Sequence, residues 1–228
     1  MSDTTYCYPH TDILKNKLNI RDKETFINVE IEATSARICE LQIKPISGQF
    51  DFNHLCKIHK YIFQDLFEWA GKPRTVDIAK GNYFCPAQNI QRYAADVFRK
   101  FYKDCYNTKQ DKDQFVHALA EHYADLNALH PFREGNGRTQ REFARELCMD
   151  CGYILDLTIT NHREMLTASR ISFNQGDNSE LKTIFKKAIT PINKYKELDS
   201  RLRNIILILS SDDLDDNLIQ EQNFGLGE

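Results

Sequence analysis

The sequence has no long apolar segment and no large excess of charge of either sign. Its 228 residues carry 30 Lys and Arg against 33 Asp and Glu, a formal net charge of −3. This near balance gives no reason to expect a nucleic-acid partner, because nonspecific binding to DNA or RNA depends on clustered positive charge. No apolar stretch approaches the ~20 residues of a membrane-spanning helix, so we expect no membrane segment.

The N-terminal residues lack a basic stretch followed by an apolar run, which is the pattern of a secretory signal. The seven cysteines are scattered and odd in number, as is typical of reduced thiols in a cytoplasmic protein. We therefore expect a cytoplasmic location. Cys148 and Cys151 form a C-x-x-C pair, but no second pair follows at zinc-finger spacing and no strand pattern precedes it. We predict that both thiols pack at the end of a helix that stops near Gly152.

Helical periodicity dominates the chain and predicts an all-α fold. At 228 residues the length suits one domain with a substantial core. We expect an N-terminal extension over 1–24, the main domain over 25–190 and a C-terminal helix with an acidic tail over 191–228. Within the main domain we expect helices at 24–42, 51–70, 87–106, 111–128, 136–151, 161–174 and 178–189.

One segment, Arg74–Cys85, departs from the helical pattern. Residues 75–78 alternate as a strand does, residues 79–82 favour a turn, and residues 83–85 are again β-prone. We predict a two-stranded flap that lies against the helices, since an isolated hairpin is only marginally stable. An irregular loop is the alternative.

The C-terminal part begins with an expected helix over Lys194–Leu209, which contains the apolar run Ile205–Leu209 and precedes an acidic stretch. Two interpretations of the apolar run stay open. It packs on the main domain, or it is shared with a partner, either a second copy in a homo-oligomer or an antitoxin-like protein.

The most informative stretch of the sequence is His130–Arg141, which reads HPFREGNGRTQR. Its glycines let backbone N–H groups approach a ligand, and the start of the next helix adds a positive field. Its arginines suit phosphate oxygens, and Glu134 is a carboxylate that can hold a divalent cation. His130 can accept a proton near neutral pH. These residue types together indicate the handling of a Mg-bound nucleotide phosphate beside an activated nucleophile.

The pattern His-Pro-Phe-x-Glu-Gly-Asn-Gly-Arg-x-x-Arg resembles the motif of Fic-domain proteins. The resemblance extends upstream through Ile58–Asp65, Trp69–Gly71 and Arg74–Gly81, and it covers about residues 25–190. It implies a helical bundle with a short β-hairpin flap. It also implies that the protein transfers AMP from ATP to a Ser, Thr or Tyr hydroxyl of a target protein, or of the protein itself, with Mg²⁺ as cofactor.

The resemblance also implies a role for each motif residue. His130 is the general base, Glu134 coordinates Mg²⁺, and Arg138 and Arg141 hold the β- and γ-phosphates. The α-phosphate lies against Asn136 and the amides around Gly135 and Gly137. An extended target segment adds to the flap by β-augmentation, at Thr75, Val76, Asp77, Ile78, Lys80 and Gly81.

Other functions stay open at this point. Gly137 favours adenylylation over phosphorylation, because a phosphorylating branch of the family carries lysine there. Another nucleotidyl or phosphoryl transfer, or removal of AMP by the same site, is not excluded by the motif. A non-enzymatic nucleotide-binding helical module is disfavoured, because His130, Glu134 and both arginines are retained.

Many Fic-domain relatives carry an inhibitory Ser/Thr-x-x-x-Glu-Gly/Asn helix whose glutamate pairs with the last arginine of the motif. This sequence has no full match. The nearest are Thr160 with Glu164 and Ser211 with Asp215. Because Asp is one methylene shorter than Glu, we expect only a weakened internal restraint on Arg141, or none. A separate partner that supplies the glutamate is the alternative.

Overall fold

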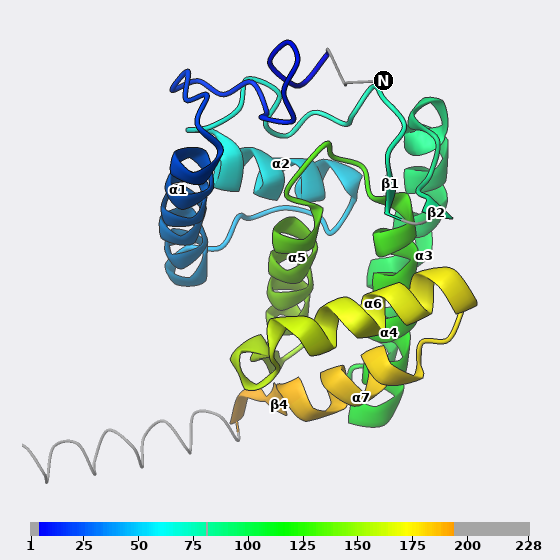
Figure 1. Cartoon of the computed structure of the whole chain (residues 1–228). Coiled ribbons are helices and arrows are strands. Elements are labelled where there is room, and N and C mark those ends of the chain that lie inside the picture. Colours follow the sequence, from blue (N-terminus) through cyan, green and yellow to red (C-terminus); the bar gives the residue numbers. More distant parts are fainter. Residues whose placement is uncertain (1–4, 81, 194–228) are drawn as a thin grey trace, which may run out of the picture. The chain divides into compact units, whose positions relative to one another are not determined.

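The computed structural model describes residues 5–80 and 82–193 (Figure 1). Residues 1–189 form one compact unit, and the second unit, 190–228, is described only through residue 193. The expected helix Lys194–Leu209 and the tail residues Ser211 and Asp215 therefore lie outside the described residues. The division into 1–24, 25–190 and 191–228 stays a prediction.

The prediction of an all-α fold is confirmed. The described part of the chain contains seven α-helices: α1 (Lys23–Ile43), α2 (Phe52–Phe63), α3 (Ile90–Thr108), α4 (Lys112–Leu129), α5 (Asn136–Asp150), α6 (His162–Gln175) and α7 (Ser179–Ala188). The strands are β1 (Ala79–Lys80), β2 (Asn82–Tyr83), β3 (Tyr153–Leu155) and β4 (Ile189–Pro191). Among residues 5–80 and 82–193, no helix combines the length and the apolar character that crossing a bilayer requires.

Side-chain caps explain where four of the helices begin. Asp22 accepts a hydrogen bond from the Thr25 amide before α1, and Asp51 caps α2 in the same way. Asp111 and Asn161 cap α4 and α6. Each cap satisfies a backbone N–H that has no partner in the first turn of a helix.

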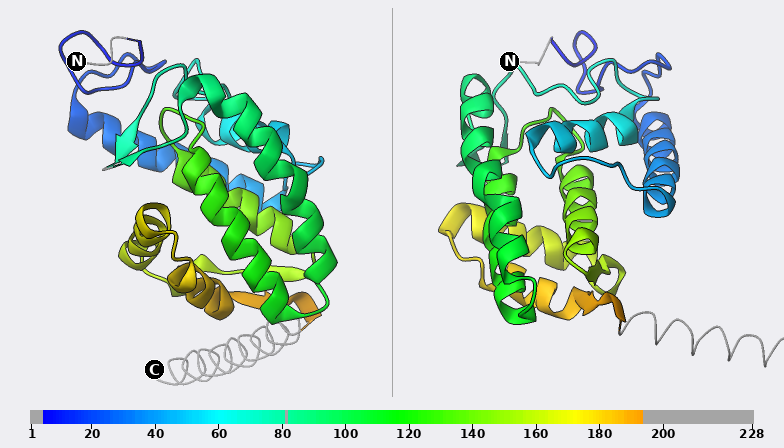
Figure 2. Two further views of the ribbon diagram at one scale, coloured as in Figure 1. Left: turned by 90° about the vertical axis from the view of Figure 1, so that its right-hand side faces the viewer. Right: turned by 180° about the vertical axis from the view of Figure 1, so that it is seen from behind.

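The motif helix α5 lies at the centre of the bundle, packed against α2 and α4 (Figures 1 and 2). Helix α4 also packs along α3, and the pair α6 and α7 packs on α4. Fully buried aromatic side chains fill the space between these helices: Phe63, Phe67, Phe101, Phe115, Phe132, Phe143 and Phe185. Because α4 leads into the motif and α5 leaves it, the core fixes both ends of the motif loop.

The second helix is shorter than the predicted 51–70, because α2 ends at Phe63. The amides of Leu66 and Phe67 both donate to the Phe63 carbonyl, which closes a turn. The carbonyl of Leu66 accepts the amide of Lys17, so the N-terminal extension takes a backbone group that a longer helix would use. The turn buries Leu66 and Phe67, and tertiary packing therefore overrides the helical pattern.

The predicted hairpin exists, but its strands lie nearer the tip than expected. Ala79 pairs with Tyr83 and Lys80 with Asn82, so three of the four paired residues lie in the segment 79–82 that we predicted as a turn. Residues 75–77 are not a strand because their polar groups have other partners. The Thr75 amide donates to the Tyr6 hydroxyl, and an Asp77 carboxylate oxygen accepts the amide of Ala87.

Candidate active site

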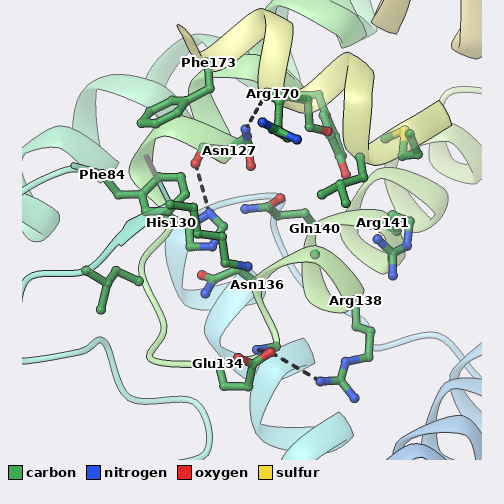
Figure 3. A pocket seen from close by; sticks show the side chains of 18 of the residues that line it. Phe84, Asn127, His130, Glu134, Asn136, Arg138, Gln140, Arg141, Arg170 and Phe173 are labelled. Carbon is green, nitrogen blue, oxygen red and sulfur yellow. Dashed lines mark hydrogen bonds and ion pairs between the residues drawn. The ribbon is translucent and has the colours of Figure 1, made fainter. Parts of the chain in front are cut away.

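The motif residues surround a cavity of about 680 Å³. Four parts of the fold form its walls, one of them the last turns of α4 with Tyr123 and Asn127 (Figure 3). The motif loop and the start of α5 make one wall, the flap contributes Ile78, Lys80 and Phe84, and α6 covers the opposite side. These segments are far apart in the sequence, so the cavity is a product of the tertiary fold.

The backbone of the motif loop turns at two residues in the left-handed region. His130 ends α4 with φ 42° and ψ 59°, and its amide donates to Leu126 O. Gly135 precedes α5 with φ 81°. A Cβ added to Gly135 would lie 2.2 Å from the Phe63 ring, so this position excludes every side chain.

Between these turns, the Asn136 side chain closes the loop. Its Oδ1 accepts the Phe132 amide at 2.9 Å, and its Nδ2 donates to the Phe132 carbonyl at 2.7 Å. The Phe132 ring is fully buried and stacks on His59, with 3.8 Å between ring centroids. Asn136 lines the cavity, but its side-chain amide is engaged in this loop, so the group that it offers a ligand is its backbone N–H.

His59 of α2 contacts the motif loop and holds it in place. Its Nδ1 accepts the amide of Gly71, which leaves Nε2 to donate to the carbonyl of Glu134 at 3.1 Å. Burial, with a smaller contribution from the charge of Arg138, lowers the pKa of His59 to about 3. The ring is therefore neutral near pH 7, with the proton on Nε2.

His130 is nearly buried, with 8% of its surface exposed. Its Nδ1 lies 3.2 Å from the carbonyl oxygen of Asn127. Because a carbonyl only accepts hydrogen bonds, Nδ1 carries the proton and Nε2 keeps its lone pair. Burial, together with the positive charges of Lys80 and Arg74, lowers the pKa of His130 to about 3. The ring is thus held as a neutral proton acceptor.

Arg74 connects the flap to the motif loop. Its buried guanidinium donates to three carbonyls, those of Val76, Cys85 and His130, at 2.8, 2.5 and 3.0 Å. Its amide also donates to Pro131 O. One side chain therefore fixes both ends of the flap against the residue that carries the imidazole.

The start of α5 supplies the groups that suit phosphates. The amides of Asn136, Gly137 and Arg138 begin a helix and have no carbonyl of a preceding turn to bind. Arg138 and Arg141 line the cavity beside them (Figure 3). A Cβ added to Gly137 would lie 3.1 Å from the guanidinium of Arg141, so the position is already tight.

Arg138 is also held by α1, a contact that the sequence did not indicate. Its guanidinium lies 2.5 Å from the carboxylate of Glu30 and 3.1 Å from the Thr34 hydroxyl. The guanidinium carbon lies 4.8 Å from the centre of the Phe63 ring. Glu30 and Thr34 share one face of α1 because they are four residues apart, but nothing in the local sequence points to Arg138.

Glu134 is the carboxylate of the cavity that suits a cation. Its side chain is 42% exposed, lies 3.6 Å from Arg138, and accepts the Gly135 amide at 2.9 Å. No group of three or more His, Cys, Asp or Glu that could hold a metal occurs within residues 5–80 and 82–193. Mg²⁺ commonly takes one or two protein carboxylates and completes its shell with phosphate oxygens and water, so this single carboxylate fits a nucleotide-bound Mg²⁺.

The structure brings most of the predicted site residues together. Nine line the cavity: Ile78, Lys80, His130, Glu134, Gly135, Asn136, Gly137, Arg138 and Arg141. Thr75, Val76 and Asp77 do not line it, and Gly81 lies outside the described residues. The cavity is also lined by residues for which the sequence predicted no role, among them Phe84, Asn127, Arg170 and Phe173.

The C-x-x-C pair lies away from this cavity, at the end of α5, as predicted. Cys148 and Cys151 are buried free thiols. Burial raises the pKa of Cys151 to about 11 and that of Cys148 well above its ordinary value. Protonated thiols are poor nucleophiles and poor metal ligands, so the pair is structural.

Comparison with known proteins agrees with this geometry. The model of the Fic/DOC family matches residues 49–148, which contain α2, the flap, the complete motif and most of α5. The chain is 36% identical over 199 residues to protein adenylyltransferase VbhT of Bartonella schoenbuchensis, covering 87% of this chain and 41% of VbhT. It is 33% identical over 186 residues to the probable protein adenylyltransferase Fic of Escherichia coli, covering 81% of this chain and 92% of that protein.

Solved structures show the same fold. One is the N-terminal Fic domain of a putative cell filamentation protein from Bartonella quintana with bound ADP. It is 25% identical, has a TM-score of 0.78, and the match covers 82% of this chain and 95% of that one. BepC from Bartonella tribocorum with bound AMPPNP, at 23% identity, has a TM-score of 0.77 and coverage of 82% and 97%. By sequence and by fold, this chain belongs to the Fic/DOC family.

Proposed function

We propose that this protein is an adenylyltransferase that transfers AMP from ATP to a hydroxyl side chain of a target protein. The observation that carries the proposal is the state of His130, which is buried at the cavity, neutral, and bound through Nδ1 to Asn127 O. Its Nε2 lone pair is therefore available beside the amides and arginines of the α5 start. The adenylyltransferase names of relatives at 33% and 36% identity support the same activity.

The reaction follows from this arrangement. His130 Nε2 accepts the proton of the target hydroxyl, whose oxygen attacks the α-phosphorus of ATP. The bond between the α-phosphorus and the bridging oxygen breaks, and pyrophosphate leaves with the electron pair. A positioned base contributes about 10²–10⁴-fold to such a step, because a neutral hydroxyl is a poor nucleophile.

We also assign protein groups to each of the three phosphates of ATP. The amides of Asn136 and Gly137, next to Gly135, hold the α-phosphate, Arg138 holds the β-phosphate and Arg141 the γ-phosphate. Glu134 holds Mg²⁺, which neutralises charge on the phosphates when bound. In phosphoryl-type reactions this positioning and neutralisation supply most of the catalysis.

The target protein binds along the flap. Ala79, Lys80, Asn82 and Tyr83 are exposed and form a hairpin of two residues per strand. Such a short ladder leaves backbone groups that an extended target segment can pair with. Because Ile78, Lys80 and Phe84 also line the cavity, a segment bound there has its side chains close to His130.

Gly137 favours nucleotidyl transfer over a kinase reaction. Its Cβ position already lies 3.1 Å from Arg141, so a lysine there would displace the guanidinium and add a charge where we place the α-phosphate. The small residue keeps this site open.

A separate proposal concerns a restraint on Arg141 by Asp215, by an antitoxin-like partner or by a second copy of the chain. The rate of AMP transfer by the variant Asp215→Ala tests whether Asp215 supplies this restraint.

Parallel reactions with α-labelled and γ-labelled ATP test the proposal. We expect protein labelling from the α-label alone, and none in the variant His130→Ala, which should still bind nucleotide. His117→Ala is the matched control, because that side chain is 62% exposed on the outside of α4. Label from the γ-position would indicate a kinase, and normal labelling by His130→Ala would remove His130 as the base.

A further inference from the structure

The flap places an aromatic ring directly on the imidazole of His130. Phe84 follows β2, and its ring centroid lies 3.8 Å from that of His130 with only 10° between the planes. Phe173 of α6 stacks on Phe84 in turn, at 4.7 Å and 27°. Figure 3 shows the three side chains at one side of the cavity. Phe84 is 6% exposed and His130 8%, so the contact between these two rings is almost closed to water.

The backbone on both sides of Phe84 is fixed. Its own amide donates to Ile78 O at 3.2 Å, across the hairpin, and the Cys85 amide donates to Ala128 O of α4 at 3.1 Å. The guanidinium of Arg74 holds Cys85 O at 2.5 Å. The position of the Phe84 ring is therefore fixed, because the main chain beside it is bound to the helix that ends at His130.

The orientation of the imidazole depends on contacts that restrain its rotation. The χ2 torsion of a histidine is broad, so the ring turns easily unless its surroundings restrain it. One hydrogen bond of 3.2 Å, from Nδ1 to Asn127 O, restrains one edge of the ring. Stacking with a 10° angle restrains its plane. Together the two contacts define where the Nε2 lone pair points.

We propose that Phe84 is a positioning residue for His130: it holds the plane of the imidazole and keeps water from one ring face, so the flap sets the orientation of the base. The inference rests on the proposed function of His130. Glu134 and Arg170 line the same cavity, and the positive charges that act on the ring are those of Lys80 of β1 and of Arg74. These charges disfavour protonation of the ring, whereas the flat contact that orients it comes from Phe84.

Substitution of Phe84 separates this role from ordinary packing. In Phe84→Leu the ring face is lost while an apolar side chain is kept, and we expect kcat to fall about 10- to 100-fold, since misorientation of a reacting group is costly. The KM for ATP should stay within about twofold, because the ring contacts of Phe84 are with His130 and Phe173 and not with the groups that we assign to the phosphates. In Phe84→Tyr the flat ring is retained, and we expect kcat within about threefold of the native value.

A second readout does not depend on activity. Titration of the His130 ring by NMR should give a pKa that rises towards 6.5 in Phe84→Leu, because water reaches the exposed face. Phe84→Tyr should keep the lowered pKa. Phe26→Leu is the matched control: Phe26 is a core phenylalanine of α1, 5% exposed, that packs on Phe67. It should lose thermal stability but keep the native kcat and the native pKa of His130.

The outcomes distinguish the two proposals. If Phe84→Leu is folded and retains both kcat and the His130 pKa, Phe84 is only a core residue and the inference is wrong. It is equally wrong if Phe84→Tyr loses as much kcat as Phe84→Leu. Should Phe84→Leu not fold, Phe84→Met supplies the apolar comparison. An active His130→Ala variant would instead overturn the role of the base itself, whatever the Phe84 variants do.

Discussion

The carboxylate of Glu30 on α1 lies 2.5 Å from the guanidinium of Arg138, which is separated from it by 108 residues of sequence. The two side chains are 13% and 24% exposed, so the pair is only partly solvated. Arg138 also bonds to the Thr34 hydroxyl. An arginine that we assign to the β-phosphate is thus held and neutralised by a neighbouring helix.

We predict that Glu30→Gln tightens nucleotide binding. Glutamine keeps a hydrogen-bond acceptor for Arg138 but removes the negative charge that opposes a phosphate there. The Kd of a non-hydrolysable ATP analogue, measured by calorimetry, should fall about 3- to 10-fold, which is roughly 0.7–1.4 kcal/mol. Glu32→Gln is the control, because Glu32 is exposed on the same helix. Unchanged or weaker binding in Glu30→Gln would show that the pair does not oppose the nucleotide.

Replacement of Gly135 by alanine should destabilise the protein strongly. The residue has φ 81°, and a Cβ would lie 2.2 Å from the buried Phe63 ring. Left-handed backbone costs about 1–2 kcal/mol for an alanine, and overpacking adds about 1–3 kcal/mol. We expect the free energy of unfolding in urea to fall by about 3 kcal/mol.

Gly176→Ala is the matched control for that measurement. Gly176 has φ 70° but nothing within 4 Å of its Cβ position. It should therefore show the backbone cost alone, about 1–2 kcal/mol. Equal losses in the two variants would mean that the Phe63 ring moves aside without cost.

We predict that the protein loses stability as the pH falls below about 6.5, and that His59 contributes to this loss. Burial lowers the pKa of His59 to about 3 in the folded state, whereas the unfolded chain binds the proton near 6.5. Between these values the unfolded state binds more protons than the folded state. The contribution of His59 to the free energy of unfolding is therefore fully present above pH 6.5 and is lost towards pH 3. His130 acts in the same direction.

Urea midpoints at pH 7.5, 6.5, 5.5 and 4.5 measure the effect. His59→Gln should be less stable at pH 7.5, because it loses the aromatic stack, and its stability should also fall less steeply as the solution is acidified. The exposed His117 gives the comparison, since His117→Gln should keep the native slope. If His59→Gln and the native protein have the same slope, the buried imidazole does not titrate as assigned.

Removal of Mg²⁺ should weaken nucleotide binding through Glu134. With EDTA in place of Mg²⁺, we expect the affinity for the ATP analogue to fall about tenfold or more, because the phosphates lose a divalent counter-ion. In Glu134→Gln, the affinity for the ATP analogue should differ much less between Mg²⁺ and EDTA. Glu180→Gln, an exposed site on α7, should keep the full difference, and a Mg²⁺ effect of native size in Glu134→Gln would exclude Glu134 as the ligand.

The motif and the helices could be predicted because their information is local. Residues 130–141 are contiguous, and their chemistry depends on a loop and a helix start that the sequence itself encodes through Gly135 and the preceding α4. Four helices begin at an Asp or Asn cap, α6 ends at the cap residue Gly176, and α5 ends just before Gly152. The failure at α2 was also physical: residues 64–70 continue a helical pattern, but the backbone of Leu66 is taken by Lys17 of the N-terminal extension.

The strand register of the flap could not be predicted from the sequence. The existence of the flap followed from β-prone residues and a turn, but its register did not, because two residues per strand carry too little alternation to specify one. Arg74, through its bonds to Val76 O and Cys85 O, decides which residues remain free to pair.

The chain's order of residues thus specifies the helices, the motif loop and the chemical groups that a nucleotide would meet, since these depend on neighbours a few positions away. The stack of Phe84 on His130, the pairing of Glu30 with Arg138 and the neutral state of His59 and His130 arise from packing between segments remote in sequence. Burial and ring contact are properties of the assembled core, and no pattern along the chain encodes which partner a side chain will meet there.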